Sequence, residues 1–306
     1  MVSNLSPSSR EFLVNLDRVQ AQVAAASQQI TSGKSVSVAS DAPDKIDSIL
    51  QLRSNIAHNS QIKTNLGLAN TDAQTADAAL TSATQLMDRA VTLGSQGATF
   101  TLDDNGRQSI ADEVQSLQDQ MLAISRTTVQ GRYIFSGDQG GVPQYASDPT
   151  APNGVNRLFT GLATQRVEGP SGGSFAAGKT AQDIFDNRNA DDTLASDNVF
   201  AALNSLQVAL RNNDTAGVSA AVGSLKMASD HIGTCQAFYG SVENRITDAT
   251  NYADAYDTQL QTQLSQKQDA DVAAAAMLLN QGTIQLQAAF QMQGKMPRSS
   301  LFDYLG

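Results

Sequence analysis

Tryptophan is absent from this chain, and aromatic residues make up only 5% of its 306 residues. Most of the apolar residues are instead alanine, leucine and valine. Such small side chains suit thin helical bundles better than a deep globular pocket. Only seven prolines occur, and four of them lie between Pro143 and Pro170. Long uninterrupted helices are therefore permitted on both sides of that stretch.

Other absences restrict which class of protein this chain can belong to. Cys235 is the single cysteine, which excludes an internal disulfide. No run of about 18 apolar residues occurs, so we expect no membrane insertion. The first seven residues lack the basic region and the apolar run of a cleavable secretory signal.

Charge is distributed unevenly along the chain. The net charge of −10 argues against a nucleic-acid partner, because phosphate contacts need clustered Lys and Arg. Residues 1–40 carry a net charge of +1, residues 260–306 carry none, and residues 41–259 carry −11. Nearly neutral ends indicate that the ends pack against something while the middle faces solvent, although chance would also produce this pattern.

Residues with recognisable chemistry are scarce. His58 and His231 are the only histidines, and we expect each to stand alone in a helix without a neighbouring cysteine or paired carboxylates. Asp269 and Asp271 are two residues apart, so on a helix their side chains point apart. No GxSxG, phosphate-loop or HExxH motif occurs. We therefore predict no catalytic, cofactor-binding or metal-binding residues, and no enzyme.

Apolar residues recur at alternating steps of three and four near both ends of the chain. Each set is sustained for nearly three heptads, which is typical of a helix that packs against another helix along its length. The two stripes have similar lengths, so each could be the partner of the other. The predicted assembly interface consists of Phe12, Leu16, Val19, Val23, Ile30, Val272, Ala276, Leu279, Leu286 and Phe290.

Between these stripes the sequence predicts further helices. Asp44 to Gly97 contains no proline, and about 50 residues at about 1.5 Å each would give a helix of roughly 75 Å. Ser40 or Asp41 is expected to cap it. A third helix follows the turn at residues 103–106. Helices resume at Val199 and are expected to continue into the C-terminal stripe.

We predict a mainly α chain with long antiparallel helices in a coiled-coil or bundle rod, in which the N- and C-terminal helices pair. Residues 137–192 are rich in Gly, Pro, Asn and Asp and predict a small β-rich insert. The predicted domains are a terminal helical assembly domain (1–40 and 260–306), a long-helix bundle (41–136 and 193–259) and the insert (137–192).

Several segments also resemble bacterial flagellins. In the N-terminal half these are QQITSGK (28–34) and ASDAP (39–43), followed by the long helix to about Phe135. In the C-terminal half they are YGSVENRI (239–246), DADVA (269–273) and SLFDYL (300–305). The combination of both ends is more specific than any single motif.

Two further segments bear on the role within the flagellin family. GRYIFSG (131–137) resembles a segment of the subunits that join hook to filament, where filament flagellins usually carry an Asn–Gly turn. AQDIF (181–185) resembles a strand-like element that ends the insert of those subunits. We therefore favour a hook–filament junction subunit. A filament flagellin is the alternative, and a coiled-coil adaptor unrelated to flagella is a remote one.

The resemblance implies partners and a location. The expected partners are hook-associated protein 1, flagellin, copies of the chain itself in a ring, and the flagellar export chaperone and apparatus. Export through that apparatus does not require a cleaved signal peptide, so the expected location is extracellular, in the flagellum.

Overall fold

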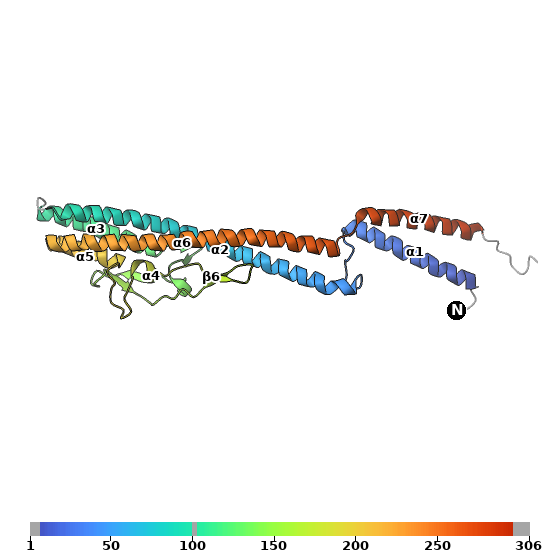
Figure 1. Ribbon diagram of the computed structural model, residues 1–306, viewed down its shortest axis with the longest axis horizontal. Helices are drawn as coiled ribbons and strands as arrows, with labels where there is room; N and C mark the ends of the chain where they lie inside the picture. Colours follow the sequence, from blue (N-terminus) through green and yellow to red (C-terminus); the bar gives the residue numbers. More distant parts are fainter. Residues whose placement is uncertain (1–6, 100–102, 296–306) are drawn as a thin grey trace, which may run out of the picture. The chain divides into compact units, whose positions relative to one another are not determined.

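The computed structural model describes residues 7–99 and 103–295, and helices dominate this part of the chain (Figure 1). The predicted mainly α fold with paired terminal helices is confirmed. The helices are α1 (Pro7–Ser32), α2 (Pro43–Gly97), α3 (Asp104–Ser125), α4 (Ala181–Phe185), α5 (Val199–Arg211), α6 (Thr215–Gln268) and α7 (Val272–Lys295).

The chain divides into two compact units. The terminal unit comprises the described residues up to His58 together with those from Tyr256 onward, and the central unit comprises Asn59–Ala255. These units place residues 41–58 and 256–259 with the terminal helices. The division into three domains stays a prediction.

Long antiparallel helices form the framework of the central unit. The side-chain amide of Asn59 in α2 donates to the carbonyl of Ala253 in α6 at 2.8 Å, and Gln236 in α6 donates to Thr81 in α2 at 3.0 Å. Positions later in α2 thus meet positions earlier in α6, as antiparallel packing requires. Asp103 caps α3 by accepting a hydrogen bond from the Gly106 amide at 2.8 Å.

Three antiparallel hairpins follow α3. The turn of the first, which lies just before the predicted insert, is formed by Gln130 and Gly131, whose φ angles are 51° and 77°. Two consecutive positive φ angles are the mark of a tight hairpin turn that matches strand twist. The second and third hairpins lie within residues 137–192, so the small β-rich insert is present. The paired strands are β1 (Thr128–Val129) with β2 (Arg132–Tyr133), β3 (Tyr145–Ser147) with β4 (Val155–Arg157), and β5 (Arg166–Glu168) with β6 (Ser174–Ala176).

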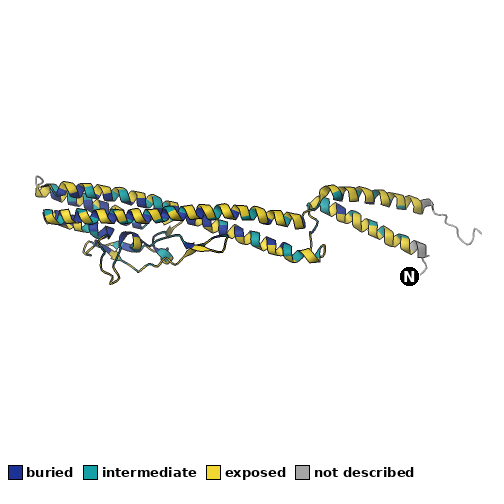
Figure 2. Cartoon of the chain, in the orientation of Figure 1, coloured by how far each residue is buried: buried dark blue, intermediate teal, exposed yellow. Residues whose placement is uncertain are grey.

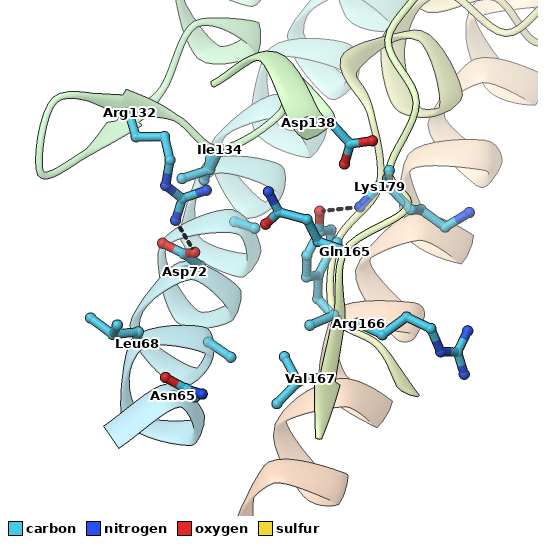
Figure 3. Close-up of a pocket in the computed structure, with 17 residues that line it drawn as sticks. Asn65, Leu68, Asp72, Arg132, Ile134, Asp138, Gln165, Arg166, Val167 and Lys179 are labelled. Carbon is cyan, nitrogen blue, oxygen red and sulfur yellow. Dashed lines mark hydrogen bonds and ion pairs between the residues drawn. The ribbon is translucent and has the colours of Figure 1, made fainter. Parts of the chain in front are cut away.

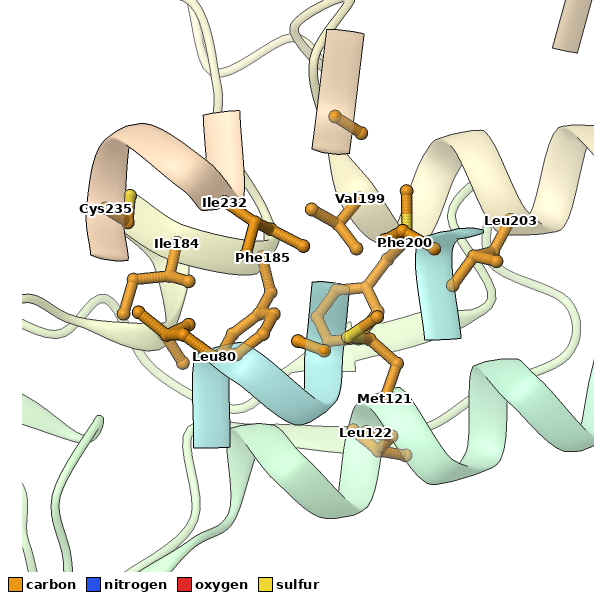
Figure 4. Close-up of a cluster of buried hydrophobic side chains, with 14 of the residues drawn as sticks. Leu80, Met121, Leu122, Ile184, Phe185, Val199, Phe200, Leu203, Ile232 and Cys235 are labelled. Atoms are coloured by element: carbon orange, nitrogen blue, oxygen red, sulfur yellow. The ribbon is translucent and has the colours of Figure 1, made fainter. Parts of the chain in front are cut away.

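The largest fully buried side chains lie where the insert meets the helices of the central unit. Phe185 of α4 packs edge-on against Phe135 with ring centroids 5.8 Å apart, and its centroid lies 5.9 Å from that of Phe200 in α5. Leu80 of α2 and Met121 of α3 complete this cluster (Figure 4). Because aromatic pairs contribute beyond their buried area, the insert is held firmly on the helices.

Two expectations about local structure are wrong. Residues 181–185 form the helix α4 rather than a strand-like element, because Thr180 and Asp183 make a reciprocal capping box at its start. Asp41 does not cap α2, because its carboxylate accepts from the amides of Ser37 at 2.8 Å and Val38 at 2.9 Å. These hydrogen bonds hold the pKa of Asp41 below its usual value, with Val38 contributing most.

The helix that leads into the C-terminal stripe is also interrupted. α6 ends at Gln268 and α7 begins at Val272, although the sequence predicts continuity. Asp271 caps α7, since its carboxylate accepts from the amides of Ala273 and Ala274, each at 3.0 Å. Asp269 forms an antiparallel bridge with Lys34, which takes the chain out of the helix.

Candidate assembly interface

Helices α1 and α7 lie side by side in the terminal unit (Figure 1). α1 turns one continuous stripe toward α7, and the members of that stripe are half-buried or buried. The spacing of three and four places them on one face of the helix. The stripe consists of Phe12, Leu16, Val19, Val23, Ala26 and Ile30.

The two helices approach closely at one point. A Cβ atom added to Gly282 of α7 would lie only 2.4 Å from Cγ2 of Val23 in α1. Ala26 and Ala275 are almost fully buried nearby in the same helix pair. Small residues allow two helix backbones to approach closely. At this contact any side chain larger than that of glycine at residue 282 would overlap with Val23 unless one of them shifted.

The structure separates the predicted residues of α7 into two groups. Leu279 and Leu286 are half-buried on the side that also buries Ala275 and Gly282. Val272, Ala276 and Phe290 are exposed, and Phe290 retains 54% of its accessible surface. The face of α7 against α1 thus consists of Ala275, Leu279, Gly282, Leu286 and Ala289, which differs from the predicted stripe.

α7 also exposes large apolar side chains on its other faces. Met277 is 69% exposed, Ile284 59% and Leu278 56%. The sequence Val272–Lys295 holds no charged residue before Lys295. A helix that is apolar on its outer faces as well as its inner face is normally buried by something else. Figure 2 shows how much of α1 and α7 is exposed.

The segment GRYIFSG anchors the insert to the central unit. The guanidinium of Arg132 forms an ion pair with Asp72 of α2. Phe135 is fully buried, and its carbonyl accepts from the Ala181 amide at 2.6 Å. Gly137 has a φ of +60°, and a Cβ there would lie 2.4 Å from the Leu162 carbonyl oxygen. Arg132, Phe135 and Gly137 of the segment thus each have a structural role.

A hollow of about 350 Å³ lies between α2 and the insert (Figure 3). The charged side chains of its wall are satisfied within the chain. Arg132 pairs with Asp72, and Asp138 accepts from Thr164. Arg166 donates to Ser174, and the Lys179 ammonium lies 5.2 Å from the centre of the Phe238 ring.

A buried carboxylate ties the insert to α5. Asp186 is fully buried and accepts hydrogen bonds from four side chains, at 2.8–2.9 Å. Burial, followed by the charge of Asp186, raises the pKa of Tyr145 far above its usual value, so its hydroxyl remains a donor. The four donors are Tyr145, Asn153, Arg188 and Asn198.

His231 does not stand alone, contrary to expectation. Its Nδ1 lies 3.3 Å from a carboxylate oxygen of Asp197, and its Nε2 lies 2.8 Å from the Asp183 carbonyl. Sγ of Cys235 is 3.8 Å from Nε2. Burial raises the pKa of the Cys235 thiol, and a protonated, buried thiol is a poor nucleophile. Residues four apart on a helix lie on the same face, so the sequence positions of His231 and Cys235 could have predicted that the two side chains are neighbours.

Two kinds of feature are absent from the part of the chain that the structure describes. No helix in the described ranges combines the length and hydropathy needed to cross a bilayer. Among the same residues, no group of three or more His, Cys, Asp or Glu side chains could hold a metal ion. The segment SLFDYL (300–305) lies outside the described residues.

The fold and the interface together define a mainly helical protein. Its terminal helices expose large apolar side chains that the rest of the described chain does not cover. Residues 3–140 match the N-terminal helical region of bacterial flagellin, and residues 222–305 match its C-terminal helical region. These matches cover most of the chain, which belongs to the bacterial flagellin family.

Individual relatives are similar to parts of the chain. Flagellar hook-associated protein 3 of Escherichia coli (strain K12) is 27% identical over 191 residues, which are 60% of this chain and 58% of that relative. The alignment thus spans little more than half of the relative's length.

Solved structures share the fold. A protein of Vibrio parahaemolyticus described as flagellar hook-associated has a TM-score of 0.64 at 16% identity, covering 75% of this chain and all of that one. Flagellar hook-associated protein 3 of Legionella pneumophila has a TM-score of 0.60 at 14% identity, covering 71% and 98%. At these identities the likeness concerns the fold.

Proposed function

We propose that this chain is a structural subunit of the bacterial flagellum that joins the hook to the filament. Family membership supports a flagellar role, and the hook-associated relatives favour the junction over the filament itself. The segment GRYIFSG, by which the sequence favours a junction subunit, anchors the insert in this fold.

One observation carries the proposal: α7 exposes large apolar side chains on the faces that α1 does not cover. Removing apolar surface from water contributes about 25 cal/mol per Å². An isolated subunit cannot gain this stabilisation, whereas a subunit docked among copies and neighbours can. Contact with other subunits would therefore stabilise the terminal helices.

Assembly then couples folding to docking. The helix pair buries mainly small residues such as Ala26, Ala275 and Gly282, so its own core contributes little. The ends become stably helical when they dock, as segments that fold on binding do. The interface comprises the ten predicted residues, with exposed Val272, Ala276 and Phe290 facing other subunits and the others closing the helix pair.

The partners follow from this role. They are hook-associated protein 1 on one side, flagellin on the other and further copies of the chain in a ring, after delivery by the export chaperone and apparatus. The subunit functions outside the cell without a catalytic step.

Labelled antibodies against this chain test the location. A single labelled point at the end of each hook is expected. Label along the whole filament would identify a filament flagellin instead, as would long filaments grown from the purified chain alone after seeding. Stable dimers that are never exported would point to an unrelated adaptor.

Two substitutions test the interface. Val19→Asp and Phe290→Asp should each abolish incorporation, because each places a charge on a surface that becomes desolvated. Gln20→Asp is a matched control at an exposed position of α1, next to Val19 in the sequence but outside the stripe. Far-ultraviolet circular dichroism should show the central unit folded in all three variants. Normal incorporation of both Val19→Asp and Phe290→Asp would refute the interface.

A further inference from the structure

The hairpin formed by β5 and β6 is fixed to the rest of the central unit at its base. Just before β5, the amide of Thr164 donates to the carboxylate of Asp138 at 3.1 Å, and the Thr164 hydroxyl donates to it at 2.7 Å. Just after β6, the amide of Lys179 donates to the hydroxyl of Tyr239 in α6 at 3.1 Å. Residues 165–178 extend from these two fixed points as an antiparallel hairpin.

A hollow borders the hairpin at each of its ends. The hollow between α2 and the insert borders the base, where residues 165–167 and 177–179 line it (Figure 3). A second hollow of about 350 Å³ borders the turn and is lined by Pro170 and Phe175 of the hairpin and by residues of α6. Protein interiors are otherwise closely packed, so the helices support little of the hairpin at either end.

One side chain anchors the hairpin between these hollows. Among the residues of β5 and β6, Phe175 is the only buried one, at 5% exposed, whereas Arg166, Glu168 and Ser174 are exposed. The guanidinium of Arg245 in α6 lies 4.5 Å from the centre of the Phe175 ring, which is within the range of an attractive cation–π contact. We call the contact between Phe175 and Arg245 the latch.

The hairpin is closed by its own hydrogen bonds, whereas its base leaves room for movement. In the turn, the amide of Gly169 donates to the carbonyl of Gly173 at 2.7 Å, and the amide of Gly172 donates to the carbonyl of Gly169 at 3.0 Å. At the base, a Cβ added to Gly178 would meet no atom within 4 Å, and glycine adopts the widest range of backbone angles. The hairpin would therefore move as one body about its base.

The two hollows reach the same helix at neighbouring positions. Tyr239 of α6 lines the first hollow, and Arg245, Ala249 and Tyr252 line the second. The last three residues are spaced by four and three, so they share one face of α6. Tyr239 and Arg245 are six residues apart, or about 9 Å along the helix. Only a short stretch under the hairpin thus separates the hollows.

We propose that residues 165–178 form a strap that is hinged at its base and held closed on α6 by the latch. Release of the latch lifts the strap and joins the two hollows into one groove along α6. The strap lies within the central unit, so it does not depend on the proposed function or on assembly.

Pulsed electron paramagnetic resonance of the spin-labelled full-length chain measures the strap directly. Ser171→Cys in the turn and Ser60→Cys in α2 place labels at exposed positions, and buried Cys235 is not labelled. This labelled parent should show one narrow distance distribution. Arg245→Ala should add a population displaced by about 2 Å or more, because the contact at 4.5 Å ceases to attract beyond about 6 Å. Phe175→Ala should displace most of the molecules.

Matched variants separate the latch from a general loss of charge or stability. Arg245→Lys keeps a cation without the planar guanidinium and should restore part of the closed population. Lys226→Ala removes a cation from another exposed position of α6 and should leave the distribution as in the parent. Because Arg245 is exposed, Arg245→Ala should remain folded, which far-ultraviolet circular dichroism checks. Distributions like that of the parent in both Arg245→Ala and Phe175→Ala would overturn the strap.

Alkylation of Ala249→Cys tests whether the hollows join. Residue 249 is half-buried and lines the second hollow, whereas Cys235 of the same chain is 1% exposed. Adding Arg245→Ala should raise the alkylation rate at residue 249 at least about threefold relative to that of Cys235, since Cys235 reacts only when the core opens. An unchanged ratio of the two rates would show that the hollows stay separate and would overturn the groove.

Discussion

The central unit and the helix pair of the terminal unit bury different kinds of side chain. In the central unit, Phe135, Tyr145, Phe185 and Phe200 are all fully buried. In the helix pair formed by α1 and α7, the most buried residues are alanine and glycine, and most of the large side chains of α7 remain exposed.

The difference shows that the two parts of the chain gain their stability in different ways. Burying a large side chain stabilises a unit by itself, at about 1.5–3 kcal/mol for each such residue. Leaving large apolar side chains outside makes stability depend on a partner. The central unit thus has a core of large side chains of its own, whereas the helix pair leaves apolar surface that the proposed assembly would cover.

The largest effect is expected from Phe185→Ala. Removing this ring leaves a cavity between Phe135 and Phe200 and should destabilise the central unit by about 3–5 kcal/mol. Urea unfolding followed by circular dichroism measures the change. Tyr252→Ala removes an exposed aromatic side chain from the same unit and should cost little. Equal effects of the two variants would show that the buried Phe185 ring contributes no more to the stability of the central unit than an exposed ring does.

A comparable loss of stability of the central unit is expected from Asp186→Ala. Without the carboxylate, buried donors from Tyr145, Asn153 and Asn198 lose their acceptor, which should cost about 3–5 kcal/mol. Asp230→Ala on the exposed face of α6 is the control. A loss below about 1 kcal/mol in urea unfolding would show that other groups or water replace the carboxylate.

Gly282→Ala should weaken the helix pair by a smaller amount. The added methyl meets Val23, and such overpacking costs about 1–3 kcal/mol. The urea concentration that releases assembled subunits should fall, while unfolding of the central unit should not change. Adding Val23→Ala should restore part of the loss, and strict additivity of the two changes would place the residues out of contact.

The smallest effect concerns Asp41. Its pKa is lowered in the folded chain by the hydrogen bonds from Val38 and Ser37. The stabilising contribution is therefore present above the ordinary value of 3.8 and is lost as the pH falls through the lowered pKa. The protection factors of the Ser37 and Val38 amides, which allow for the intrinsic slowing of exchange in acid, should fall in that acid range. Asp41→Asn should remove the pH dependence, and an unchanged profile would show that another group is responsible.

The spacing of apolar residues in the sequence was sufficient to predict the buried face of a helix wherever that helix has only one apolar face. The stripe of α1 from Phe12 to Ile30 stands out because polar or charged residues such as Asp17, Arg18 and Gln28 lie between several of its members, and the structure turns that stripe toward α7. In α7 apolar residues occur all round the helix, so spacing alone could not select a face. The predicted stripe therefore includes Val272 and Phe290, which the structure leaves exposed.

Composition and the local pattern of residues established that the chain is mainly helical, that its middle carries the acidic charge, and that residues 137–192 interrupt the helices. Local patterns suffice for these features because backbone propensities and turn residues act over a few neighbours. Tertiary structure alone decided the break between α6 and α7, the face of α7 that meets α1, and the antiparallel bridge between Lys34 and Asp269. These features depend on contacts between residues more than 200 positions apart, which no local pattern encodes.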